Sequence, residues 1–67
     1  MILRERYSVG TKIGALEGRV LSTYMGACLA CEQTTRFTTR AVADADHDAE
    51  IEVCEVCLTV KKFAGLN

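Results

Sequence analysis

Two cysteine pairs constrain the fold of this 67-residue chain more than any other feature of its sequence. Cys28 and Cys31 form one Cys-x-x-Cys pair, Cys54 and Cys57 form the other, and 22 residues separate the pairs. Two residues between cysteines let both thiolates of a tight turn face one ion, so two such turns supply the tetrahedral sulfur set that Zn²⁺ prefers. The spacing therefore predicts one zinc ion per chain, with these four cysteines as ligands.

Iron is the alternative metal, because a rubredoxin-like electron carrier also uses four thiolates. Such a centre usually lies in an aromatic-rich core, whereas only 6% of this chain is aromatic. Redox chemistry of a single pair requires a βαβ context that the sequence does not indicate. We therefore expect zinc in a structural role, since four thiolates leave no position open for a substrate.

The size of the chain also favours a metal-stabilised fold. A core built from 67 residues contributes only a few kcal/mol, so domains of this size often need a staple. Cysteines that bind metal indicate a reducing compartment, so we expect a cytoplasmic protein. The longest uncharged stretch, residues 20–31, is too short to span a membrane, and the charged residues 4–6 argue against a signal peptide.

The segments around the second pair predict an antiparallel sheet. Residues 33–43 and 49–53 are rich in strand-forming side chains, and the polar residues 44–48 between them predict a turn. Residues 58–63 predict a last strand. A hairpin over residues 33–53 would return the second cysteine pair to a place beside the first.

With these features, residues 26–63 resemble the zinc-ribbon fold group. The resemblance rests on the two cysteine pairs and the strand-like segments between them, and it implies a small β domain built on two metal-binding turns. Zinc ribbons occur in transcription machinery, ribosomes and enzyme accessory domains. Many carry Pro after the first cysteine of each turn and Gly after the second, positions that this chain fills with Leu29 and Glu55, then Glu32 and Leu58.

The N-terminal segment, residues 1–25, matches no family. Alternation of apolar and polar residues up to Val9 predicts a strand that ends at Gly10. Residues 13–24 then permit a helix capped by Thr11, although Gly14 and Gly18 would each cost it about 1 kcal/mol. The alternative, which we favour, is a turn near residues 17–18 followed by a strand. We expect one domain, 1–67: a small metal-bound, mainly β, zinc-ribbon-like antiparallel sheet with an N-terminal β or short helical segment.

Charge and composition bear on function. The net charge is −1, divided into +3 over residues 1–43 and −4 over residues 44–67, so the chain lacks the basic excess of a phosphate-coating protein. No catalytic set of side chains is evident, and we expect no cavity of a few hundred Å³, so we predict that it is not an enzyme. Split polarity suits docking to another protein. We expect a small adaptor or accessory, regulatory protein, including on a transcription or nucleic-acid complex as the fold resemblance suggests.

Direct DNA or RNA binding is the alternative function. In a strand, Thr34, Arg36, Thr38 and Arg40 share one face, and two arginines with hydroxyls between them can meet phosphates. The further candidates for this surface are Phe37, Arg19, Lys61 and Lys62. The competing interpretation is structural: Arg40 forms a cross-strand ion pair with Glu50 or Glu52.

The acidic residues between the strands are the last candidates. Asp44, Asp46, Asp48, Ile51 and Glu55 have the spacing of a calcium-binding EF-hand loop. However, Ala49 replaces the glycine of the tight turn, and Glu55 lies inside the second cysteine pair. We interpret the segment as a solvated acidic loop with His47 at its tip.

Overall fold

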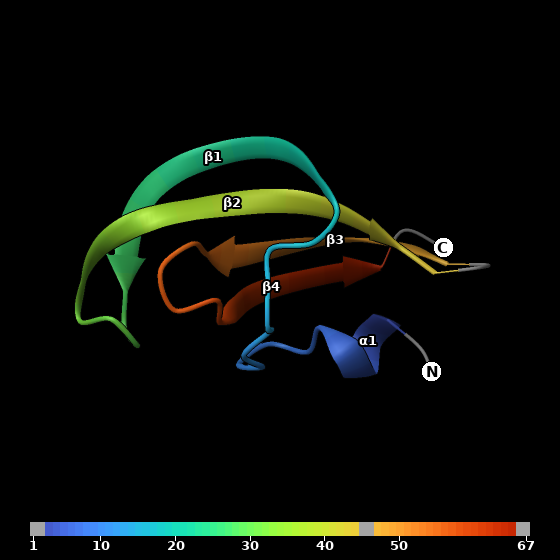
Figure 1. The fold of residues 1–67 in the computed structure, drawn as a ribbon, viewed down its shortest axis with the longest axis horizontal. Helices are drawn as coiled ribbons and strands as arrows, with labels where there is room; N and C mark the ends of the chain where they lie inside the picture. Colours follow the sequence, from blue (N-terminus) through green and yellow to red (C-terminus); the bar gives the residue numbers. More distant parts are fainter. Residues whose placement is uncertain (1–2, 45–46, 66–67) are drawn as a thin grey trace.

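The computed structural model describes residues 3–44 and 47–65 of the chain. It contains one four-stranded antiparallel sheet, in the spatial order β1-β2-β3-β4, and one short helix that precedes the strands (Figure 1). The elements are α1 (Leu3–Arg6), β1 (Arg19–Cys28), β2 (Gln33–Ala43), β3 (Asp48–Cys54) and β4 (Val60–Gly65). The expected small, mainly β, antiparallel fold is therefore confirmed.

The β2–β3 hairpin sets the geometry of the molecule. β2 has the predicted bounds, and β3 extends the predicted segment by one residue at each end. Its register pairs Phe37 with Cys54 and Ala43 with Asp48. The end of β3, and with it the second cysteine pair, is thereby placed beside the middle of β2.

The first residues form a helix, so the strand expected up to Gly10 is wrong. Leu3 and Tyr7 are only 3% and 2% exposed, and the Tyr7 amide donates to the Leu3 carbonyl at 2.9 Å. Residues four apart lie on one face of a helix, so a helical turn buries both side chains against the sheet. Leu3 and Tyr7 would also share one face of a strand, so the sequence pattern could not distinguish a helix from a strand. α1 has four residues, and no helix in the described residues is long and apolar enough to cross a bilayer.

The larger core lies between α1 and one face of the sheet. Ile13 and Phe63 pack against its margin. Its buried members come from the helix, from three strands and from the residue just after α1: Leu3, Tyr7, Val42, Ala49, Ile51 and Val60. The N-terminal segment is therefore part of the folded unit and covers one face of β2, β3 and β4.

Residues 10–18 connect the helix to β1 and pair with the sheet on the way. The Gly10 amide donates to the Val60 carbonyl at 2.8 Å, and Lys12 forms a bridge with Thr59, so this segment lines the start of β4. The chain then turns at Gly18, which has a φ of 85° and lies so close to Ala41 that an added Cβ would be 2.2 Å from its carbonyl oxygen. The turn and following strand that we favoured for this region are confirmed, and the helical alternative is wrong.

Candidate metal centre

The four cysteines gather at one end of the sheet as free thiols. Cys28 ends β1, Cys54 ends β3, and Cys31 and Cys57 follow in the connecting turns. The Sγ atoms of Cys28 and Cys57 are 3.7 Å apart, those of Cys31 and Cys54 are 3.8 Å apart, and all four lie within 4.8 Å of one another. Four sulfurs at 2.3 Å from a tetrahedral ion are separated by about 3.8 Å, so the cluster fits a zinc-ribbon-like metal site.

The two cysteine turns, residues 28–32 and 54–58, have the same backbone design. The Glu32 amide donates to the Cys28 carbonyl at 2.8 Å, and the Leu58 amide donates to the Cys54 carbonyl at 2.9 Å. Each turn ends on a residue in the left-handed region, Glu32 with a φ of 57° and Leu58 with a φ of 60°. Leu58 thus completes a turn, which is why the last strand begins at Val60, two residues later than predicted.

Hydroxyl and amide groups surround the sulfurs of the second pair. Thr35, which is buried on β2, places its Oγ1 3.1 Å from Cys54 Sγ. The Val56 amide donates to the same sulfur at 3.4 Å, and Thr59 Oγ1 lies 3.3 Å from Cys57 Sγ. Donors of this kind stabilise a thiolate and orient it toward a bound ion.

The pKa values of the thiols reflect these surroundings. Burial, together with hydrogen bonds to the neighbouring thiols, raises the pKa of Cys31 to about 12. Burial acts to raise the pKa of Cys54 too, but hydrogen bonds led by that of the Thr35 hydroxyl lower it to about 6. Cys54 thus loses its proton readily, whereas Cys31 keeps it. A divalent cation bound by the cluster would favour the thiolate form of all four cysteines.

An apolar pocket of about 280 Å³ opens beside the cysteine cluster. We did not expect a space of this size in so short a chain, and that expectation is wrong. Lys61 lies at its margin and brings the ammonium group within 4.6 Å of the centre of the Phe37 ring. The apolar side chains that line it come from the N-terminal segment, the first cysteine turn, β2 and β4: Val9, Ala27, Leu29, Ala30, Phe37 and Val60.

Phe37 links this pocket to β1. It is buried between the cysteine cluster and the ring of Tyr24, which stacks on it with 5.3 Å between ring centres. The Tyr24 hydroxyl donates to the Glu52 carboxylate, and this hydrogen bond raises the pKa of Tyr24 to about 12. Phe37 therefore packs inside the fold and contributes one wall of the pocket, while Tyr24 is the ring closer to solvent.

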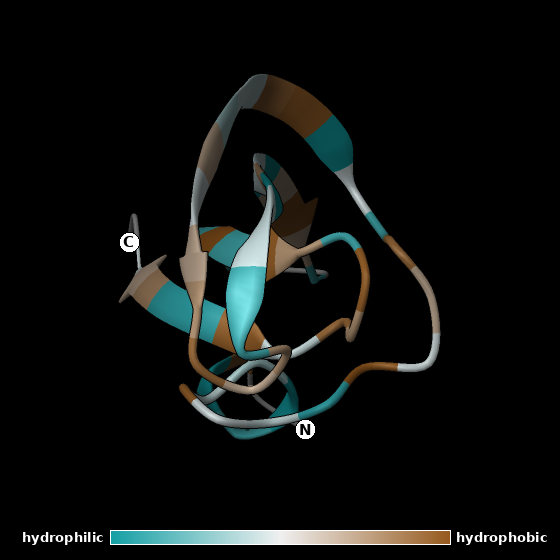
Figure 2. Cartoon of the chain, turned by 90° about the vertical axis from the view of Figure 1, so that its left-hand side faces the viewer, coloured by the Kyte–Doolittle hydropathy of each residue, from teal (hydrophilic) through white to brown (hydrophobic). Residues whose placement is uncertain are grey.

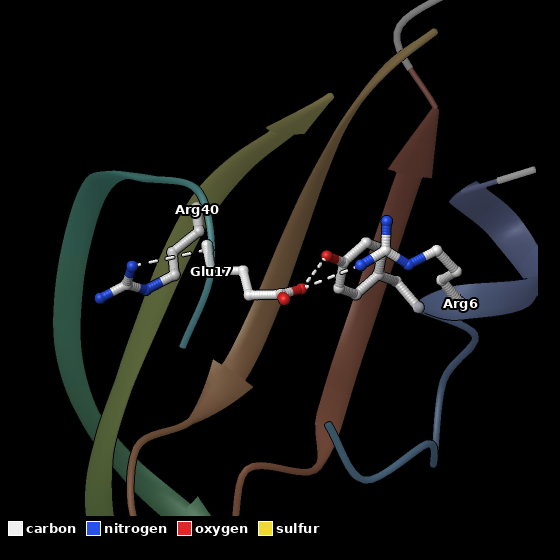
Figure 3. Close-up of polar contacts among 4 residues, drawn as sticks. Arg6, Glu17 and Arg40 are labelled. Carbon is white, nitrogen blue, oxygen red and sulfur yellow. Dashed lines mark hydrogen bonds and ion pairs between the residues drawn. The ribbon is translucent and has the colours of Figure 1, made fainter. Parts of the chain in front are cut away.

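The two arginines predicted for a contact surface have different surroundings. Arg36 is exposed on β2. Arg40 pairs with Ile51 across the hairpin, so its side chain is on the opposite face from Glu50 and Glu52, and the expected ion pair is wrong. Instead, Arg40 Nη1 donates to the Gly18 carbonyl at 3.0 Å. It also donates to the Glu17 carbonyl at 3.5 Å (Figure 3), and the two hydrogen bonds hold the turn before β1.

The other basic candidates lie elsewhere on the sheet. Arg19 begins β1 opposite Ala41. Lys61 and Lys62 are exposed on β4, where Lys62 is the cross-strand partner of Glu52. The described structure thus distributes these side chains over both outer strands, and Lys62 has an acidic neighbour.

Glu17 is a contact point that the sequence did not reveal. Its carboxylate accepts hydrogen bonds from the Tyr7 hydroxyl and, at 3.3 Å, from Arg6, and so ties the N-terminal segment to the turn that Arg40 holds (Figure 3). Thr35 and Thr59 were missed as well. The strand pairing places Thr35 near a sulfur, because Phe37, two residues further along β2, is the cross-strand partner of Cys54.

The described residues of the acidic loop do not form a calcium site. Asp48 begins β3, and Glu55 lies in the second cysteine turn, where no helix follows. The Asp44 amide donates to the His47 carbonyl at 2.8 Å, and the His47 side chain is exposed. Asp46, another predicted member, lies outside the described residues.

No protein-family model matches the chain, and no curated protein or solved structure is significantly similar to it.

Proposed function

We propose that this chain is a zinc-binding module that acts through protein–protein contacts, with the metal in a purely structural role. Cys28, Cys31, Cys54 and Cys57 would hold one Zn²⁺, which would join β1, β3 and the two turns at one end of the sheet. The sulfur separations support this assignment, because they match a tetrahedral thiolate site. A shell of four thiolates has no free position, so the ion supplies stability and not chemistry.

The apolar pocket beside the cysteine cluster is the observation that carries the proposed interaction. Its lining is apolar apart from Lys61 and Thr59, and it contains no acid–base pair that would suggest catalysis. Leu29, which lines the pocket, is 93% exposed, so this large apolar side chain adjoins the apolar lining. Contiguous exposed apolar surface of this kind is typical of protein–protein sites. A pocket of this size accommodates one large apolar side chain of another polypeptide.

Lys61 suggests the chemistry next to that side chain. Its ammonium group lies over the rings of Phe37 and Tyr24 and forms no ion pair within the described residues, so it is available to a carboxylate of the partner. We therefore propose that the partner presents a large apolar residue beside Asp, Glu or a chain terminus. Direct nucleic-acid binding has weaker support, because Arg40 is engaged with backbone carbonyls and Phe37 is only 2% exposed.

Selection from a random peptide library against the metal-loaded chain tests this proposal. We expect enrichment of peptides with a large apolar residue next to an acidic one. Leu29→Asp should abolish their binding, whereas Val56→Asp, an equal change at a 63% exposed residue of the other cysteine turn, should not. Absence of any enriched peptide would contradict the proposal. So would tight, salt-sensitive binding of short DNA or RNA that Arg36→Ala abolishes.

A further inference from the structure

The two cysteine turns are anchored to the rest of the fold to different extents. Both lie at the left end of the sheet in Figure 1, which is the end that faces the viewer in Figure 2. The second turn, residues 54–58, is tied to its neighbours by backbone hydrogen bonds on two sides. The Glu55 amide donates to the Arg36 carbonyl at 2.9 Å, and the Ile13 amide donates to the Leu58 carbonyl at 2.9 Å. This turn is therefore held both by β2 and by the N-terminal segment.

The first turn, residues 28–32, lacks such anchors within the described part of the chain. Its backbone hydrogen bonds there are the one inside the turn and those of the β1–β2 ladder, and β1 is an edge strand of the sheet. Leu29 and Glu32 are exposed. Glu55 and Leu58, at the same positions of the second turn, are half-buried. Segments with few buried contacts and exposed hydrogen bonds open locally more readily than the rest of a fold.

The sulfur atoms show the same difference between the turns. Thr35 Oγ1 lies 3.1 Å from Cys54 Sγ, and Thr59 Oγ1 lies 3.3 Å from Cys57 Sγ. Among the described residues, the polar partners of the first pair's sulfurs are other thiols of the cluster. The second pair thus has hydroxyl partners that orient its sulfurs, whereas the first pair depends on the cluster alone.

The weakly anchored turn also forms part of the apolar pocket. Residues 28–30 line the pocket together with Ala27, which precedes them in β1. The rest of the lining comes from Phe37, residues 9–10 and residues 59–61, and residues 54–58 of the second turn contribute nothing to it. A movement of the first turn would therefore change the width of the pocket and leave the remaining lining in place.

We propose that the first cysteine turn is a lid that opens by itself and closes over the apolar side chain of a partner, an inference that rests on the proposed docking function. Leu29, which is 93% exposed, would cover that side chain when the lid closes. Because Cys28 and Cys31 belong to the lid, a partner that holds it closed should also slow the loss of metal. Docking and metal retention would thus reinforce each other through one short segment.

Amide hydrogen exchange of the zinc-loaded chain, followed by NMR, tests whether the lid opens. The Glu32 and Leu58 amides are a matched pair, because each donates to the carbonyl of the first cysteine of its own turn, at 2.8 and 2.9 Å. We expect the protection factor of Glu32 to be at least about tenfold lower, because local opening requires less free energy than opening of an anchored segment. Equal protection of the two amides, or lower protection of Leu58, would overturn the proposal. This comparison needs no partner, so its outcome is independent of the docking function.

A short synthetic peptide that contains phenylalanine beside aspartate is the probe for closure of the lid. At ten times its Kd it should raise the protection of Glu32 about tenfold and leave that of Leu58 nearly unchanged. It should also slow the transfer of zinc to a chromophoric chelator by a similar factor. Leu29→Asp should abolish both effects, and Val56→Asp, at a 63% exposed residue of the second turn, should preserve them.

The outcomes separate the lid from the docking function. A peptide that shifts the Phe37 and Lys61 resonances without slowing exchange at Glu32 would overturn the lid and leave the docking function standing. A peptide that shifts neither resonance would contradict the docking function, and the exchange of Glu32 in the free chain would still decide whether the turn opens.

Discussion

Glu32 and Leu58 occupy equivalent left-handed positions, with φ values of 57° and 60°, at the ends of the two cysteine turns. Each donates its amide to the carbonyl of the first cysteine of its own turn. Side chains other than glycine are strained in this region, by roughly 1–2 kcal/mol. The chain thus forms both cysteine turns with a side chain other than glycine at this position, and substitution can test whether the strain exists.

Relief of that strain should stabilise the metal-loaded protein. We predict that Glu32→Gly raises the free energy of unfolding by about 0.5–1 kcal/mol. This gain is the strain energy that the substitution removes, reduced by the greater conformational entropy of glycine in the unfolded chain. Glu32→Ala removes the same carboxylate but keeps a Cβ, so it should show no such gain. Denaturant titrations at saturating zinc measure both changes, and equal stabilities of the two variants would contradict the explanation.

The hydroxyl of Thr35 should tune the metal site. It lies 3.1 Å from Cys54 Sγ and is buried, so Thr35→Val removes a donor to the thiolate with little change of shape. Loss of such a partner commonly costs about 10- to 100-fold in metal affinity. Thr34→Val, on the exposed neighbouring residue, should have little effect. Competition with a chelator of known affinity measures both, and equal affinities would show that the hydroxyl does not act on the sulfur.

Arg40 should contribute to stability and Arg36 should not. Arg40→Ala removes a charged donor from the carbonyls of Gly18 and Glu17, which should lower the free energy of unfolding by about 1–2 kcal/mol. Arg36→Ala, at an exposed residue of the same strand, should change it by less than about 0.5 kcal/mol. Thermal unfolding of both variants provides the comparison. Similar melting temperatures would mean that the turn before β1 does not need Arg40.

Tyr24 should make the fold sensitive to alkaline pH. Its pKa is raised from 10.0 to about 12 by the hydrogen bond to Glu52, so the folded chain favours the neutral phenol. A raised pKa in the folded state stabilises the protein below pH 10, and this contribution is lost as pH rises from 10 toward 12. Absorbance titration should show a tyrosine that ionises earlier in Glu52→Gln than in wild type. Glu50→Gln, two residues away on β3, is the control, and an identical shift in both variants would contradict the assignment.

Much of the fold follows from local patterns in the sequence. The bounds of β2 were predictable because its Thr, Phe and Val residues favour strands, and the cysteine spacing indicated that the pairs converge. The helix at Leu3 was not predictable, because apolar residues at positions 3 and 7 satisfy both a helical and a strand period.

The partner of Arg40 was missed for another reason. A shift of one residue in a hairpin register moves a side chain to the other face, and only the structure fixes the pairing with Ile51. The contacts of Glu17 involve residues ten or more positions apart, which no local pattern reveals.

The central claim is that one zinc ion on the four cysteines holds this fold together, and stepwise removal of the metal tests it most directly. Far-ultraviolet circular dichroism of the zinc-loaded chain would be recorded during titration with a strong chelator, with the metal content measured at each step. We predict one zinc per chain at the start, loss of the β-sheet spectrum in proportion to the zinc removed, and its recovery when zinc is restored. An unchanged spectrum in the metal-free chain would contradict the claim, as would a purified protein whose visible absorption and metal content identify iron in place of zinc.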